Sequence, residues 1–183
     1  MKHHSDDLVM LFNDLFRSSH RTILVRGGEE PEYIPATAPG NPARIIFAHG
    51  YYASALHEIS HWCIAGKYRR TLHDYGYWYC PDGRNAEQQK AFEQVEVRPQ
   101  ALEWLFSVAA GFRFHISLDN LTGSGCGDEA AFRRNVRIQA GTYLREGLPV
   151  RAASVHQALL TFYGRQGLFR DAWNQECLSS TEQ

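Results

Sequence analysis

The sequence predicts an α+β fold, a single helix-dominated domain with a small sheet and a central metal-binding helix. Its 183 residues are enough for one domain with a sizeable core. Apolar residues recur at helical spacing in several long stretches, whereas the β-branched runs are few and short. One helical stretch contains an H-E-x-x-H pattern at residues 57–61. We therefore treat residues 1–183 as one domain, with 179–183 as a flexible tail.

Composition and charge exclude several classes of protein. The net charge of −1 predicts neither nucleic-acid binding nor attraction to an anionic membrane. The four cysteines are scattered without a C-x-x-C pair, which argues against a zinc ribbon or a dithiol redox motif. No apolar run is long enough to span a bilayer, and the first residues lack a signal-type apolar core. We expect a cytoplasmic protein with reduced thiols.

Local patterns predict the order of the elements. Helices are expected from an N-cap at Ser5 to about residue 18, from an N-cap at Asn85 with a kink or break at Pro99, from Asp128 to about residue 146, and from an N-cap at Ser154 to residue 164. Strands are expected at residues 22–25, 44–49 and 112–118. Residues 29–42 are expected to form a surface loop. Leu168, Phe169 and Trp173 are expected to dock the C-terminal segment onto the core.

The helix around residues 57–61 carries the clearest chemical signal. His57 and His61 are four residues apart, so a helix places both imidazoles on one face, where they can reach a single divalent ion. The opposite face carries an apolar stripe, formed by Tyr52, Ala55, Ile59, Trp62 and Cys63. A helix that binds metal on one side and is apolar on the other is expected to be central.

Two histidines usually need a carboxylate to complete a catalytic metal site. A polar line on the next helix contains Glu93, Glu96, Gln100 and Glu103. We favour Glu96 as the third ligand, because the flanking Val95 and Val97 predict burial, where an unpaired carboxylate is costly. Glu93 is the alternative. In a third interpretation, these acids are simply a solvated helix face.

Aromatic residues crowd the segment that joins the two helices. Four of them fall within residues 75–79, directly before a Pro-Asp-Gly turn. Tyrosines with polar tips suit the wall of a substrate pocket, although core packing explains part of the pattern equally well. His49, at the end of a predicted strand, is open to the same two interpretations, as a pocket residue or as a structural hydrogen-bonding group.

Three ordered blocks of sequence resemble the bacterial elongation factor P hydroxylase family. They are FAHGYYASALHEISHWCIAGK at 47–67, GYWYCPDGR at 76–84 and VEVRPQALEWLF at 95–106. The resemblance covers most of the domain and is weakest in the last third of the chain. It implies a non-haem metal hydroxylase that acts on the lysine of elongation factor P after a β-lysyl group has been attached. It also implies that His57 and His61 bind the metal, with a carboxylate from residues 93–96.

The resemblance also implies which cofactor and which substrate contacts to expect. A two-histidine, one-carboxylate site with open positions suits Fe(II), with molecular oxygen as co-substrate. Glu58 is then a proton carrier or an anchor for the site. The modified lysine is a long cationic arm, for which Asp74, Asp82 and Tyr79 are candidate contacts.

Two other functions are compatible with the bare H-E-x-x-H pattern. In a zinc hydrolase, Glu58 would be the general base that activates a metal-bound water. In a non-catalytic module, the metal would be structural, and loss of His57 would unfold the chain.

Overall fold

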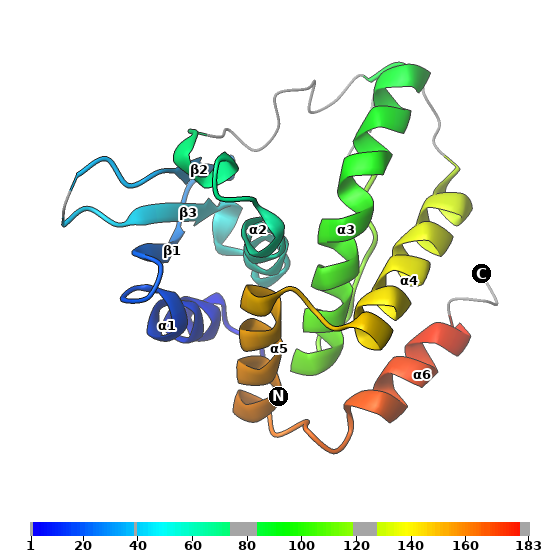
Figure 1. The fold of residues 1–183 in the computed structure, drawn as a ribbon. Coiled ribbons are helices and arrows are strands. Elements are labelled where there is room, and N and C mark those ends of the chain that lie inside the picture. The colour runs from blue at the N-terminus through cyan, green and yellow to red at the C-terminus, as the bar shows by residue number, and fades with distance from the viewer. Residues whose placement is uncertain (1, 39, 74–83, 119–127, 180–183) are drawn as a thin grey trace.

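A computed structural model of the chain describes residues 2–38, 40–73, 84–118 and 128–179 (Figure 1). These residues form a helix-dominated α+β fold with a three-stranded sheet, as the sequence predicted. The elements, in chain order, are α1 (Ser5–Phe16), β1 (Thr22–Arg26), β2 (Glu32–Ile34), β3 (Ala43–Phe47), η1 (Ala48–Gly50), α2 (Tyr52–Ile64), η2 (Arg69–Thr71), α3 (Ala86–Ala110), α4 (Glu129–Glu146), α5 (Val150–Phe162) and α6 (Phe169–Ser179).

The sheet lies at one side of the molecule and has the strand order β1-β3-β2 (Figure 1). The central strand β3 is parallel to β1 and antiparallel to β2. Strand β2 was not predicted, because the Pro-rich stretch around it indicated only a loop. The strand predicted over residues 44–49 ends at Phe47, since His49 turns into a left-handed conformation (φ 54°) and its N–H bonds the carbonyl of Gly28 at 2.8 Å.

Helix α2 occupies the centre of the fold and packs against α1, β3, α3 and α5. The predicted apolar stripe is buried in full, and Leu56 is buried with it. The central position expected for this helix is therefore confirmed. At its end, the Arg151 guanidinium of α5 donates to the carbonyls of Trp62, Cys63 and Ala65 at 2.6–3.0 Å. These bonds satisfy carbonyls that have no partner within the helix.

Helix α3 has 25 residues, so it is about 38 Å long, and it packs against α2, α4, α5 and α6. Asn85 caps it as predicted, in a reciprocal capping box with Gln88. The left-handed Gly111 ends it (φ 69°). A kink or a break was predicted at Pro99, and the helix runs through this residue undivided. All residues from Pro99 to Ala110 are buried, and this packing outweighs the cost of about 3 kcal/mol for an interior proline.

Two predicted helix starts are wrong. Ser5 is the first residue of α1 rather than its cap, and its Oγ accepts a hydrogen bond from Arg26 at 3.0 Å. Ser154 lies inside α5, which begins at Val150 after Pro149, and its Oγ bonds the carbonyl of Val150. Serine is favoured at N-caps, but inside a helix it can bond its own backbone instead. The cap predicted at Asp128 is confirmed, because its side chain accepts from the N–H of Ala131.

Residues 112–118 do not form the predicted strand. The backbone of Ser117 and Leu118 pairs with side chains in place of a neighbouring strand, from Gln100 of α3 and from Arg84, which precedes α3. The Gln100 amide donates to the carbonyl of Ser117 at 2.7 Å and accepts from its N–H at 3.1 Å. The carbonyl of Leu118 accepts from Arg84 at 2.7 Å. The alternating pattern therefore does not produce a strand here, because Ser117 and Leu118 bond side chains instead of a neighbouring strand.

Helices α4 and α6 flank α3 on the side away from the sheet (Figure 1). Trp173 of α6 packs edge to face on Trp104 of α3, so the C-terminal segment docks on the core as predicted. Residues 180–183, which belong to the predicted flexible tail, lie outside the described residues. Among the helices in the described part of the chain, none is both long and apolar enough to cross a bilayer.

Candidate metal centre

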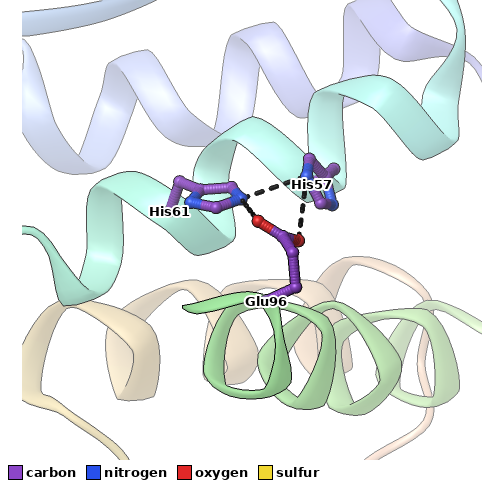
Figure 2. A group of neighbouring side chains, drawn as sticks. All are labelled: His57, His61 and Glu96. Carbon is purple, nitrogen blue, oxygen red and sulfur yellow. Dashed lines mark hydrogen bonds and ion pairs between the residues drawn. The ribbon is translucent and has the colours of Figure 1, made fainter. Parts of the chain in front are cut away.

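Three predicted site residues meet where α2 packs on α3. His57 and His61 point from α2 towards Glu96, which points back from α3 (Figure 2). One potential ligand atom from each residue lies within 4.8 Å of the other two. The two histidines are on one face because they are four residues apart, and Glu96 faces them because α3 runs alongside α2.

The distances between these atoms suit a single ion. The Nε2 atoms of His57 and His61 are 3.0 Å apart, and Glu96 Oε1 lies 3.3 Å from His61 Nε2. The second carboxylate oxygen of Glu96 lies 3.7 Å from His57 Nε2. Two ligand atoms that are each about 2.1 Å from one metal, at roughly a right angle, are themselves about 3.0 Å apart. The donor set of two nitrogens and one oxygen therefore has the spacing of a metal site.

The burial of Glu96 gives a second reason why this cluster suits a cation. Its side chain is 1% exposed, and its Oε1 has no hydrogen-bond partner among the described residues. The other oxygen accepts from the Gln100 amide at 3.4 Å. A buried carboxylate oxygen without a donor is costly, and a divalent ion at this point would satisfy it. The residues present thus fit a divalent metal.

His57 is also held from its other side. Its Nδ1 lies 2.9 Å from Glu103 Oε2, and the Glu103 side chain is 10% exposed. One carboxylate of α3 therefore faces each nitrogen of the His57 ring. The sequence placed Glu103 on the polar line of α3, but this role was not predicted for it.

The charged groups of the cluster shift one another's pKa. Burial works to lower the pKa of His57, but the hydrogen bond and charge of Glu103, together with the charge of Glu96, raise it to about 10. Burial and the neighbouring His57 hold the pKa of His61 well below its usual range. Burial raises the pKa of Glu96, and His57 and Gln100 oppose that shift. The carboxylates of Glu103 and Glu96 therefore favour a positive charge at this point of the site.

The alternative ligand Glu93 lies elsewhere on α3. Its carboxylate accepts from the Gln89 amide at 3.4 Å, and it is not part of the three-residue cluster. Glu58, the predicted catalytic residue, is partly exposed on α2, and its charge helps to raise the pKa of His57.

Among the described residues, the structure brings no candidate substrate contact together with the metal cluster. His49 is exposed on η1, with its ring against Tyr51, and none of its described contacts is with the cluster. Asp74, Tyr79 and Asp82 lie outside the described residues.

A buried cation, Arg84, lies beside Leu118, the last described residue before 119–127. Arg84 is 1% exposed, donates to Gln89 Oε1 at 2.9 Å and to the carbonyl of Leu118, and stacks over the Phe92 ring at 3.9 Å. Its charge also acts to lower the pKa of Glu96. No sequence pattern identified Arg84, because an isolated arginine is normally exposed.

Fold and site together define a helix-dominated α+β protein with a two-histidine, one-carboxylate cluster between two packed helices. A profile of the elongation factor P hydroxylase family matches residues 11–173. The elongation factor P lysine hydroxylase of Haemophilus influenzae is 49% identical over 166 residues, which cover 91% of this chain and 93% of that relative. The chain therefore belongs to the elongation factor P hydroxylase family.

Proposed function

We propose that this protein is a non-haem, iron-dependent hydroxylase that oxidises the β-lysyl-modified lysine of elongation factor P, in the last step of that modification. Membership of the family and the name of the Haemophilus influenzae relative support the reaction and the protein substrate. We place the reaction in the cytoplasm, because the substrate is a translation factor.

One observation carries the metal part of the proposal. The Glu96 carboxylate is buried, one of its oxygens has no hydrogen-bond donor among the described residues, and it faces the converging Nε2 atoms of His57 and His61. Three protein ligands leave further positions open for small molecules, which is the arrangement of non-haem iron oxygenases. When bound, ferrous iron would supply the redox chemistry with molecular oxygen. One oxygen atom would enter a C–H bond of the substrate, and the other would leave as water, with two electrons from an external reductant and two protons from solvent.

The residues of this chain hold the ion and receive the substrate. His57, His61 and Glu96 would bind the metal, and Glu58 would carry a proton or anchor the site from α2. The modified lysine is cationic, so Asp74, Asp82 and Tyr79 are proposed to bind it through charge and cation–π contacts. His49 is proposed as a further contact at the start of the metal-binding helix.

A zinc hydrolase is the rival function, and the H-E-x-x-H sequence of α2 is the observation that favours it. In that enzyme, Glu58 would activate a water molecule and no oxygen atom would be added to the substrate. The donor set alone does not separate the two, because zinc also accepts two histidines and a carboxylate.

The choice of metal and the chemistry of the product separate these functions. We would load metal-free protein with ferrous iron or with zinc and incubate each sample with β-lysylated elongation factor P, oxygen and a reductant. We expect elongation factor P to gain the mass of one oxygen atom with the iron-loaded protein and not with the zinc-loaded protein. Peptide cleavage by the zinc-loaded sample, without oxygen insertion in either, would establish the hydrolase instead.

A further inference from the structure

Glu103 is the buried carboxylate of the site that has no part in the proposed ligand set. Its Oε2 lies 2.9 Å from Nδ1 of His57, on the side of the ring away from Glu96. The distance is that of a hydrogen bond between an imidazole N–H and a carboxylate.

The spacing of Glu96 and Glu103 along α3 explains how one helix places a carboxylate on each side of the His57 ring. Glu103 follows Glu96 by seven residues, close to two helical turns, so both side chains leave α3 on the face that meets α2. Gln100 lies between them on the same face and donates to Glu96 Oε2. The three side chains form one buried polar stripe opposite the histidines.

A neutral imidazole carries its proton on one nitrogen and a lone pair on the other. A carboxylate at Nδ1 favours the form in which Nδ1 carries the proton, because the other form would point a lone pair at the negative charge. That form leaves the lone pair on Nε2, which faces His61 Nε2 at 3.0 Å. Carboxylates that bond the free N–H of a ligating histidine fix its orientation and raise its basicity.

We propose that Glu103 is a positioning residue for the metal site, and that its carboxylate holds His57 with the proton on Nδ1 and the Nε2 lone pair directed at the ion. This inference rests on the metal site of the proposed function. Glu103 acts through His57 and does not itself contact the metal.

The first test measures metal affinity rather than activity. Cobalt(II) is titrated into metal-free wild type, Glu103→Ala and Glu103→Gln, and binding is followed by visible absorption. Glu103→Ala is expected to weaken binding about 10–100-fold, the range found for such partners of metal ligands. Glu103→Gln keeps an acceptor for the Nδ1 proton and is expected to recover most of the affinity. Val108→Ala, a buried change five residues further along α3, is the control for lost stability.

The second test observes the proton itself. In zinc-loaded protein labelled with ¹⁵N, the Nδ1 proton of His57 is expected to give a protected signal in wild type and Glu103→Gln. In Glu103→Ala it is expected to exchange with water.

The possible results distinguish the role of Glu103 from the metal site itself. If wild type fails to bind cobalt, the metal site and the role of Glu103 are both overturned. If wild type and Glu103→Ala bind equally well, the site stands and the role of Glu103 is refuted. A lower melting temperature for Glu103→Ala with unchanged affinity would show that the carboxylate serves only the fold.

Discussion

Glu96 owes its place beside the histidines to helical periodicity. The sequence favoured it over Glu93 because two valines flank it, yet Val95 is 48% exposed. What buries Glu96 is its position on the face of α3 that also carries Gln89, Gln100 and Glu103, all of them buried. The spacing of Gln89, Gln100 and Glu103, at i−7, i+4 and i+7 from Glu96, was the more reliable signal. The expected location of Glu96 is confirmed, and its role as a metal ligand stays a prediction.

The first prediction concerns this carboxylate. Glu96→Gln removes the negative charge between the histidines, so the protein is expected to lose at least about tenfold in metal affinity. Glu93→Gln is the matched control, because Glu93 lies one turn earlier on the same helix and bonds Gln89 instead. Metal content after dialysis, measured by elemental analysis, checks both variants. Retained metal in Glu96→Gln together with loss in Glu93→Gln would transfer the role to Glu93.

Other contacts of the site could not be predicted from single residues. The bond from His57 to Glu103 joins positions 46 apart in sequence, and the buried Arg84 reaches the carbonyl of Leu118 across 34. Both depend on how α3 lies against its neighbours. A sequence pattern reports the face of one element, but it does not report which atoms of another element meet that face.

At the scale of elements, the predictions failed where contacts between elements outweigh a local sequence pattern. Residues 112–118 alternate like a strand, but Gln100 and Arg84 take the hydrogen bonds that a neighbouring strand would supply. Pro99 was expected to kink or divide α3, yet α3 is one undivided helix, and its second half is wholly buried. In both places tertiary contacts override a local preference.

The contact between α5 and α6 is expected to make stability depend on pH. His156 of α5 packs edge to face on Phe169 of α6, and its Nε2 is buried with no hydrogen-bond partner among the described residues. Burial lowers the pKa of His156 to about 4, whereas the unfolded chain binds the proton near 6.5. The unfolded state therefore gains protons first as the pH falls. The contribution of His156 to the free energy of unfolding is fully present above about pH 6.5 and is lost progressively towards pH 4.

His156→Leu removes this titration. Between pH 7 and pH 5, wild type is expected to lose up to about 2 kcal/mol more unfolding free energy than the variant. Urea unfolding of both proteins at the two pH values, in the presence of a chelator, measures the difference. Equal losses in wild type and variant would show that His156 is not held neutral by the fold.

At the scale of the whole molecule, α2 joins the sheet side of the fold to the helices around α3. The fold class and the order of most elements were predictable, because periodicity and caps are local. The short strand β2 and the true start of α5 were not, since Pro and Ser indicate turns and caps wherever they occur. The site lies where α2 and α3 pack, so metal binding should stabilise the fold as a whole.

A metal that binds only the folded chain is expected to raise its melting temperature. At about 100 times the dissociation constant the gain is about 2.7 kcal/mol, which corresponds to roughly 5–10 °C for a protein of this size. His57→Ala is expected to stay folded, with a melting temperature that the metal does not change. Thermal melting with and without cobalt(II) checks both statements. Unfolding of His57→Ala at room temperature would favour a structural metal.

The source of the inserted oxygen tests the central claim most directly. Iron-loaded protein is incubated with β-lysylated elongation factor P and a reductant under oxygen gas of the heavy isotope, in ordinary water. Mass spectrometry of the modified peptide is expected to show one heavy oxygen atom in wild type and none in Glu96→Gln. An unmodified or cleaved peptide, or an oxygen atom that comes from water, would contradict the assignment as an iron-dependent hydroxylase.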